Sequence, residues 1–362
     1  MTVFRKDITK GEKIEVPGVI IDRSPDFARV YIGSPSIATI PDASYVASHD
    51  WFGPGTSNNR TAVFGSSNRG KTWRKLVDLD GQWWSTLFTH HGALYIIGTD
   101  NVYGNTVLRR SSDGGKTWTE PKDEKSGLLL SGGKYHCAPV PVIVHAGRIW
   151  RAMEDSRASG GWPRHFRAFV MSARADADLL QARNWSCSNR LHFDPAWFQA
   201  KRPGWLEGNM VVAPGGELLN VLRFNENHGD RAAITHVSPD GKKLTFNPEQ
   251  GIIGFPGGRS KFTIRYDPKT RRYWSLVNKQ TNPPAYRNIV ALTSSADVRD
   301  WKVESIILRH DEQKHHAWQY LDWLFEGDDI IVVSRTAWDG SHNAHDSNYM
   351  TFHLIENFRS LL

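Results

Sequence analysis

Short apolar runs alternate with polar turns along the whole chain, and no stretch has the spacing of an amphipathic helix. One arrangement recurs: an apolar strand, a polar turn, and a second strand that ends in polar residues. It occupies residues 36–50, 85–100, 139–155, 208–224, 262–278 and 322–336. The second strands end at His49, Thr99, Glu154, Arg223, Asn278 and Arg335, at intervals of 50 to 69 residues. Because a further strand and turn follow each hairpin, the pattern predicts repeated units of about four antiparallel strands.

The turn that follows the third strand of a unit is also repeated. The segments "SSNRGKTW" (66–73) and "SSDGGKTW" (111–118) begin 45 residues apart, and Asn, Asp and Gly at these positions suit a tight turn. Six units predict an all-β protein, a single β-propeller domain over residues 1–362 with six blades; a seventh, degenerate blade is the alternative. The sixth unit is cut short, so we expect the N-terminal strand in "KIEVPGVIID" (13–22) to complete it and close the ring.

Composition narrows the choice of partner. A chain of 362 residues with 39% hydrophobic residues and 15 Trp can bury a large core, and its apolar runs are shorter than the ~18 residues of a membrane span. The formal net charge of +7 favours an acidic partner. Because Lys and Arg are dispersed along the chain, neither a nucleic acid nor a membrane is the predicted partner. Cys137 and Cys187 form no CxxC motif, so we expect two buried thiols.

In a propeller, the start of each innermost strand and the end of the second strand face one mouth of the central funnel. These positions recur as charged or polar residues in every unit, which predicts a site for a polar ligand. The candidates that could react or carry a proton are Tyr320, Glu207, His49 and His136. The candidates for ligand binding are Arg223, Arg335, Lys261, Asp50, Glu154, Asp155 and Asn278.

Glu207 and Arg223 lie at the two ends of one hairpin, and we therefore expect them to be neighbours on the rim of the funnel.

No cofactor is predicted. No metal site is predicted either, because His315 and His316 are adjacent on an expected strand and would face opposite ways. Trp51, Trp83, Trp84 and Trp162 have two interpretations: stacking on sugar rings, or burial between blades.

Three segments resemble the sialidase superfamily. "SSDGGKTW" is similar to the Asp-box repeat of that superfamily, which marks the propeller fold and lies away from the active site. "WQYLDWLFEGDD" (318–329) resembles the segment with the Tyr nucleophile of exo-sialidases, and "WLEGNMVVAPGGELLNVLRF" (205–224) resembles the one with its activating Glu and a carboxylate-binding Arg. The resemblance implies Tyr320 as nucleophile, Glu207 as the base that takes its proton, and Arg223 as a ligand of the substrate carboxylate. A phenol with a pKa near ~10 needs such a base at neutral pH.

The first unit departs from the sialidase pattern. Gly33 and Ser34 stand where an arginine is expected, and "GTSNNRTAVF" (55–64) lacks an acidic proton donor. Lys261 or Arg265 is the candidate replacement for another arginine of that pattern. The segment "SPSIATIPDASYVASHDWFGPG" (34–55) is instead similar to propeller enzymes that cleave rhamnosyl–glucuronic acid linkages, a group of hydrolases and lyases.

Three hypotheses follow, with an acidic oligosaccharide or polysaccharide as the predicted ligand. The favoured one is hydrolysis of a glycosidic bond next to an acidic sugar by Tyr320 and Glu207, with His49 or His136 handling protons. The second is β-elimination beside a uronate carboxylate, with a His or Tyr as the base and arginines stabilising the charge that develops. The third is a non-catalytic glycan-binding propeller.

The N-terminal stretch leaves two alternatives for localisation. Residues 1–16 lack the apolar segment of a signal peptide, so the chain either stays inside the cell or has lost a leader. Of the two we expect the second, a secreted or periplasmic protein whose leader has been removed.

Overall fold

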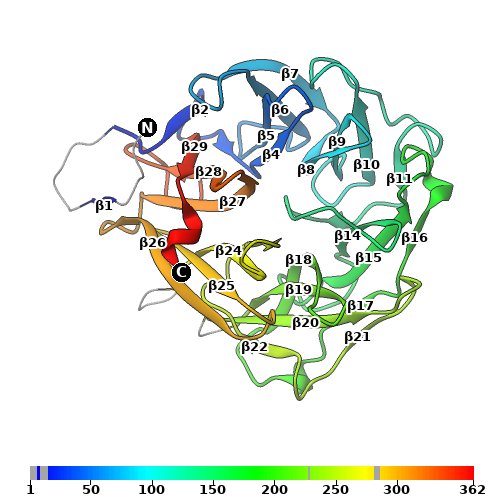
Figure 1. Cartoon of the computed structure of the whole chain (residues 1–362). Coiled ribbons are helices and arrows are strands. Elements are labelled where there is room, and N and C mark those ends of the chain that lie inside the picture. The colour runs from blue at the N-terminus through cyan, green and yellow to red at the C-terminus, as the bar shows by residue number, and fades with distance from the viewer. Residues whose placement is uncertain (1–5, 9–14, 227–228, 281–285) are drawn as a thin grey trace.

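The computed structural model describes residues 6–8, 15–226, 229–280 and 286–362. It is a six-bladed β-propeller, as the repeats predict (Figure 1). Each blade is an antiparallel sheet whose first strand lies nearest the central axis, and the chain runs outward through the blade before it crosses to the next. None of the helices in the described residues is long and apolar enough to cross a membrane.

The first three blades follow one another in chain order. Blade 1 contains β3 (Tyr31–Ile32), β4 (Ser36–Thr39), β5 (Tyr45–Phe52), β6 (Arg60–Ser66) and β7 (Arg74–Asp80). Blade 2 contains β8 (Trp83–His90), β9 (Ala93–Thr99), β10 (Thr106–Ser111) and β11 (Leu128–Leu130). Blade 3 contains β12 (Tyr135–His136), β13 (Ile143–His145), β14 (Arg148–Asp155), β15 (Arg167–Arg174), β16 (Trp185–Cys187) and β17 (Leu191–His192).

The last three blades complete the ring. Blade 4 contains β18 (Gly204–Val212), β19 (Leu218–Asn225), β20 (Arg231–Val237), β21 (Leu244–Phe246) and β22 (Ile252–Gly254). Blade 5 contains β23 (Thr263–Asp267), β24 (Arg272–Asn278), β25 (Ile289–Ser295) and β26 (Trp301–His310), with β1 (Lys6–Ile8) parallel to β26. Blade 6 contains β27 (Ala317–Glu326), β28 (Asp329–Ala337), β29 (Tyr349–Ile355) and β2 (Val19–Arg23). Three short 3-10 helices are η1 (Ala182–Asn184), η2 (Pro195–Trp197) and η3 (Phe358–Leu361).

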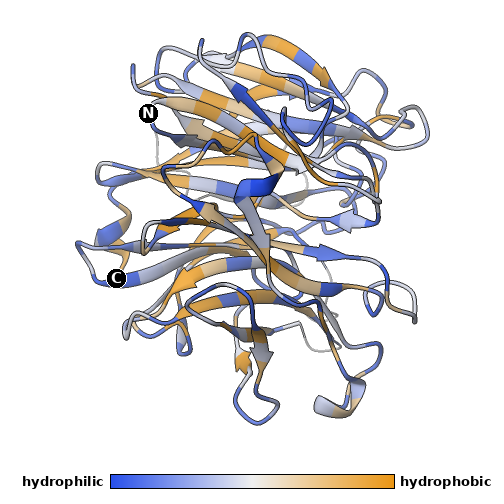
Figure 2. Ribbon diagram, turned by 90° about the vertical axis from the view of Figure 1, so that its right-hand side faces the viewer, coloured by the Kyte–Doolittle hydropathy of each residue, from blue (hydrophilic) through white to orange (hydrophobic). Residues whose placement is uncertain are grey.

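The core is divided among the junctions between blades. Among the described residues, six apolar clusters each join two successive blades. Figure 2 shows the matching pattern, with hydrophobic colour along the strands and hydrophilic colour in the loops. Large aromatic side chains fill these junctions, since Trp150, Trp205, Trp274, Trp318 and Trp323 are fully buried. A blade therefore buries its faces only against its neighbours.

The repeated turns share one hydrogen-bond pattern. The Ser111 hydroxyl donates to Asp113, whose carboxylate also accepts the Thr117 N–H at 2.9 Å. The indole N–H of Trp118 donates to the Gly115 carbonyl at 2.9 Å. The turn at 66–73 repeats these bonds with an Asn in place of the Asp. Side chains at fixed positions thus close the turn and hold the Trp against the sheet.

The two cysteines differ in their surroundings. Cys137 is buried, as expected, whereas Cys187 is only partly buried because it ends β16, a short strand on the outer side of blade 3. Both are free thiols.

The N-terminal strand closes the ring, as predicted. In β2, Val19 pairs with Phe352 of β29, so the outermost strand of the last blade comes from the other end of the chain. Ile21 is 8% exposed and lies in the cluster that joins blades 6 and 1, whereas its neighbour Ile20 is 47% exposed. The strand therefore contributes both backbone pairing and one apolar side chain to the closure.

We predict that Ile21→Ala lowers the free energy of unfolding by about 2–4 kcal/mol, because it leaves a cavity at the closure. Ile20→Ala on the same strand is the control and should change it by less than about 0.5 kcal/mol. Urea or thermal unfolding of the two variants measures the difference. Equal effects would show that the buried side chain of β2 does not contribute to closure.

Candidate active site

Three inner strands carry the same irregularity where they enter the funnel. In β18, Leu206 pairs with Arg223 and Asn209 with Val221, so two inner residues face one on the second strand. The inner strands β8 and β27 have the same bulge. In each case the first extra residue has a left-handed backbone conformation, with φ of 48° at Trp84, 54° at Glu207 and 54° at Tyr320. A non-glycine residue with such a φ is strained and is often found at functional sites.

The bulges bring Tyr320 and Glu207 together across the funnel. The Tyr320 hydroxyl donates a hydrogen bond to Glu207 Oε1 at 2.9 Å. The other oxygen, Oε2, accepts from Arg223 Nη1 at 2.8 Å, and that guanidinium also lies 3.5 Å from the Tyr320 oxygen. The expected proximity of Glu207 and Arg223 is therefore present, with Tyr320 as the third member.

Burial and charge act on the pKa values of this group in opposite ways. Burial raises the pKa of Tyr320, and the neighbouring Glu207 carboxylate raises it further against three nearby arginines. Burial alone would also raise the pKa of Glu207, but the charges of Arg223 and His136 and the hydrogen bonds from Arg223 and Tyr320 together hold it below the ordinary value. At neutral pH the pair therefore consists of a neutral phenol and a carboxylate that accepts its hydrogen bond.

Two further guanidinium groups lie over the Tyr320 ring. The Cζ atoms of Arg335 and Arg287 are 5.0 Å and 5.6 Å from the ring centre. Arg335 donates to the His345 carbonyl through Nε at 3.1 Å, and Arg287 donates to the Gln319 side-chain carbonyl. Within the described residues neither guanidinium forms an ion pair with a carboxylate, so two uncompensated positive charges face the funnel. Burial lowers the pKa of Arg287 to about 10, and the charges of Arg223 and Arg335 contribute.

The sequence did not indicate Arg287. It comes two residues before β25, the third strand of blade 5, whereas the predicted positions were the starts of first strands and the ends of second strands. It lies within the segment "KQTNPPAYRN" (279–288), which has no clear strand pattern and so gave no sign that this side chain reaches the axis.

His136 and Glu154 form a second polar pair beside the first. The His136 Nδ1 lies 2.6 Å from Glu154 Oε1, and this oxygen also accepts the Glu207 backbone N–H at 3.1 Å. The imidazole packs against the Trp84 ring, with centres 4.2 Å apart, and against Phe166. In the described residues its Nε2 has no hydrogen-bond partner. A carboxylate thus orients the imidazole next to the Tyr320–Glu207 pair.

His49 does not join this group. It is fully buried, with Nε2 2.9 Å from Asp22 of β2 and its ring against Trp51 and Phe64. Because adjacent strand residues face opposite sides of a sheet, His49 points toward blade 6 while Asp50 points toward blade 2. The position expected for a proton carrier is therefore part of the ring closure.

Asp50 lies against Gly33, one of the two residues that stand where the sialidase pattern expects an arginine. Its carboxylate accepts the backbone N–H groups of Ser34 and Trp84, the latter at 2.8 Å. A Cβ atom added to Gly33 would lie 1.7 Å from Asp50 Oδ1, so no side chain fits there. Burial raises the pKa of Asp50.

Three other candidates hold the scaffold together. Asp155 accepts two hydrogen bonds from Arg167, at 2.7 and 2.8 Å. Asn278 donates to the Trp318 carbonyl at 2.6 Å and so links blades 5 and 6. Lys261 Nζ donates to the carbonyl of Leu321, next to Tyr320, at 2.7 Å, and burial lowers its pKa to about 8.

The loop between β28 and β29 places His345 beside the site. Its sequence pattern did not predict a catalytic or binding role for this residue. The His345 side chain is 58% exposed, and its Nδ1 lies 2.7 Å from Asp346 Oδ1. The charge of Arg335, followed by burial, lowers the pKa of His345 to about 4. The lowered pKa of this imidazole is thus a consequence of the positive charge of Arg335 at this side of the funnel.

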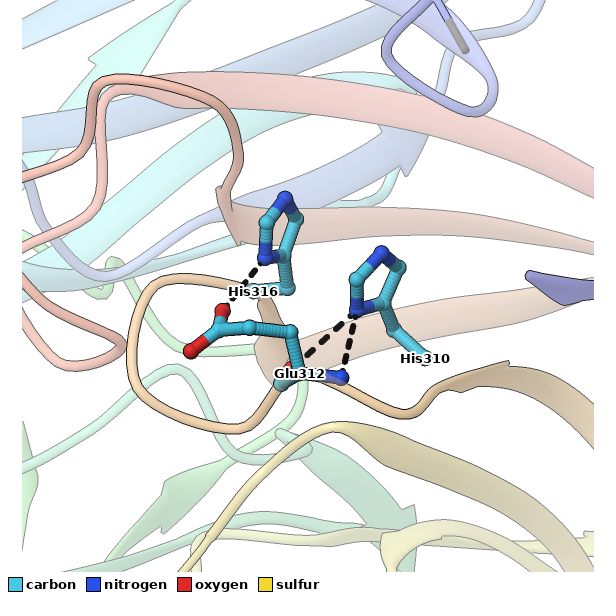
Figure 3. A group of neighbouring side chains, drawn as sticks. All are labelled: His310, Glu312 and His316. Atoms are coloured by element: carbon cyan, nitrogen blue, oxygen red, sulfur yellow. Dashed lines mark hydrogen bonds and ion pairs between the residues drawn. The ribbon is translucent and has the colours of Figure 1, made fainter. Parts of the chain in front are cut away.

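One group of side chains offers ligand atoms for a metal ion. In the described residues, His310, Glu312 and His316 are the three whose ligand atoms lie within 4.8 Å of one another (Figure 3). His316 pairs with His310 rather than with its neighbour His315, and the two rings stack with centres 3.9 Å apart. Glu312 lies 2.6 Å from Nδ1 of His316 and Asp339 lies 3.0 Å from its Nε2. Each nitrogen of His316 thus has a carboxylate partner. These contacts are also explained without a metal ion, as a link between the ends of blades 5 and 6.

Solved structures share this fold. Over 95% of this chain and 98% of theirs, the protein superposes on the alpha-L-arabinanase of Penicillium chrysogenum with a TM-score of 0.63 and 13% identity. The alpha-L-arabinofuranosidase of Fusarium graminearum gives 0.64 and 12% over 94% of this chain and 97% of that one. The sialidase of Trypanosoma rangeli gives 0.60 and 14% over 91% of this chain and 55% of that one. No family model and no curated protein matches the sequence.

The likeness to sialidases expected from the repeated segments is thus present at the level of the fold, together with a likeness to arabinanases. These relatives are six-bladed propellers like the present chain. The comparisons therefore define the class by its fold: a six-bladed β-propeller, which these solved structures share.

We predict that Lys261 makes stability depend on pH in the alkaline range. Its pKa is about 8 in the folded protein and 10.5 ordinarily, so between these values the unfolded chain binds one more proton and stability rises with pH. The free energy of unfolding of the wild type should therefore increase relative to Lys261→Met from pH 8 to pH 10.5. If chemical denaturation shows that the difference in unfolding free energy between wild type and Lys261→Met stays constant across this range, the lowered pKa of Lys261 is contradicted.

Proposed function

We propose that the protein is a glycoside hydrolase that cleaves a glycosidic bond of a sugar bearing a carboxylate, within the central funnel. One observation carries the proposal: the Tyr320 hydroxyl donates to the Glu207 carboxylate at 2.9 Å, beneath two guanidinium groups that form no ion pair with any described residue. The pair supplies a nucleophile and its base, and the arginines supply an anion site. Tyr nucleophiles are a known exception to the two-carboxylate scheme of glycosidases.

The first chemical step uses the pair directly. The Tyr320 oxygen attacks the anomeric carbon while Glu207 accepts the phenolic proton, and the bond from that carbon to the leaving oxygen breaks. Arg223 holds the Glu207 carboxylate 2.8 Å away and so fixes its orientation. Water then attacks the anomeric carbon and the bond from that carbon to the Tyr320 oxygen breaks. The sugar departs with a new hydroxyl, and the proton returns from Glu207 to Tyr320. The net change is the addition of one water across the bond.

The arginines select the substrate. A guanidinium binds a carboxylate through two parallel hydrogen bonds. Among the described residues, Arg335 and Arg287 donate to neutral oxygens and form no ion pair with an acidic side chain. Their charge also favours the anionic over the neutral sugar. Lys261, in contrast, donates to protein oxygens beneath the site and holds the bulge of Tyr320.

His136 is our candidate for the proton of the leaving group. Glu154 holds its Nδ1 at 2.6 Å, which leaves Nε2 to give a proton to the departing oxygen and to take one from the attacking water. Asp50 does not suit this role, since backbone N–H groups occupy its carboxylate. The proposal thus replaces the missing acid of blade 1 by a histidine from blade 3.

The structural neighbours support the class of reaction, since they include an arabinanase, an arabinofuranosidase and a sialidase. Elimination is the second candidate, because the His136–Glu154 pair could equally remove a proton beside a uronate carboxylate held by the arginines. Incubation with sialylated, rhamnosyl-glucuronate and ulvan-type oligosaccharides, followed by mass spectrometry, separates them. Products that gain one water support hydrolysis, and unsaturated products without that gain overturn it in favour of elimination. Binding without any cleavage overturns both and favours a glycan-binding protein.

We predict that Tyr320→Phe lowers kcat by about 10³ or more, because it removes the nucleophilic oxygen. The dissociation constant of the substrate should change by less than about threefold, since the arginines remain. Tyr266→Phe at an exposed position is the control and should behave as the wild type. Steady-state kinetics and calorimetric binding measure the two quantities, and retention of kcat in Tyr320→Phe would exclude the proposed nucleophile.

We also predict that Arg335→Gln raises KM for the acidic substrate by about tenfold or more, because a charged hydrogen bond is lost. The methyl ester of the same substrate should show less than a twofold change. Arg174→Gln, which removes an exposed ion pair with Asp176, is the control. Equal effects on acid and ester would mean that Arg335 supports the fold rather than the carboxylate.

A further inference from the structure

A second cavity lies beside the catalytic group. It has a volume of about 430 Å³ and is lined by Trp162, Lys201, Arg202, Asn225, Glu226 and Arg259, together with Pro163. It adjoins the site through Arg223, whose Cζ lies 5.7 Å from the centre of the Trp162 ring. The Nε of Arg223 donates to the Arg259 carbonyl at 2.6 Å, so one wall of the cavity also positions an arginine of the funnel.

Trp162 gives this cavity an aromatic surface. Its side chain is 48% exposed, whereas most of the large aromatic residues fill the junctions between blades. Because Trp162 is exposed to solvent next to a guanidinium, it lacks the hydrophobic stabilisation that burial gives to other tryptophans in this fold. Its flat face is available for stacking on a pyranose ring, with the polar edge free for hydrogen bonds.

Positive charge surrounds the ring. Lys201 and Arg202 are exposed and Arg259 is half-buried, and in the described part of the chain none of the three forms an ion pair. Opposite charge is confined to the buried Glu226, whose Oε2 lies 3.6 Å from Arg231 Nη1. The cavity therefore suits a carboxylate or sulfate group, and the Asn225 side-chain carbonyl offers an acceptor for a sugar hydroxyl.

We propose that this cavity is a second sugar subsite, which binds the next acidic residue of an oligosaccharide whose scissile bond lies at Tyr320. The pyranose ring stacks on Trp162, and its anionic group faces Lys201, Arg202 and Arg259. The volume falls in the range of small-molecule sites. The inference rests on the proposed function and extends it: the substrate is an acidic chain rather than a single terminal sugar on an arbitrary carrier.

The test measures binding in the Tyr320→Phe background, so that no turnover interferes. The probes are glucuronic acid and a tetrasaccharide of rhamnose and glucuronic acid, titrated by calorimetry. Adding Trp162→Ala should weaken the tetrasaccharide by about tenfold and change glucuronic acid by less than twofold, and Trp162→Phe should restore most of the loss. Lys201→Gln with Arg202→Gln should weaken the tetrasaccharide and reduce the dependence of its affinity on salt. Tyr266→Ala, at another exposed aromatic residue, is the matched control.

Two results overturn the subsite while leaving the proposed function intact. One is an unchanged affinity for the tetrasaccharide in Trp162→Ala. The other is an equal loss for both probes, which would mean that Trp162 only supports Arg223. If Tyr320→Phe binds neither probe and the wild type cleaves no acidic oligosaccharide, the proposed function fails and the subsite fails with it.

Discussion

The packing of each blade against two neighbours is the constraint on which the rest of the molecule depends. Every apolar cluster in the described residues spans two blades, so none of these sheets buries its faces alone. The ring must therefore close, and β2 from the N-terminal end closes it by pairing with β29. His49 adds a polar contact to Asp22 in the same junction. The funnel exists only because this closure brings the inner strands to one axis.

The bulges turn this regular scaffold into a site. Glu207 and Tyr320 each hold a left-handed backbone conformation at φ 54°, which costs on the order of 1 kcal/mol or more for a residue with a side chain. The surrounding sheets hold the backbone there, and Lys261 is tied to the carbonyl that follows Tyr320. As a result, two side chains from blades 4 and 6 meet at hydrogen-bond distance. We interpret this strain as the structural basis of the contact between Tyr320 and Glu207 on which the proposed function depends.

Positive charge exceeds negative charge among the side chains around Tyr320. Glu207 and Arg223 compensate each other at 2.8 Å, whereas Arg287 and Arg335 contact neutral oxygens. Burial lowers the pKa values of Arg287 and Arg335, and neighbouring arginines lower those of Arg287 and His345. An anionic ligand would relieve this repulsion, and the cations around Trp162 extend the same preference beyond the site.

The sequence by itself determined the blade number, the turns and the origin of the closing strand, because these follow from local apolar periodicity and from turn residues at fixed positions. It also placed Glu207 and Arg223 on one hairpin and pointed to Tyr320. Only the tertiary structure decided which strand ends face the axis. His49 and Asp155 turn away from it, and Arg287 reaches it from a third strand. The reason is physical: a shift of one residue, or a bulge, sends a side chain to the other face of its sheet, and the arrangement of six blades around one axis fixes which face meets the ligand.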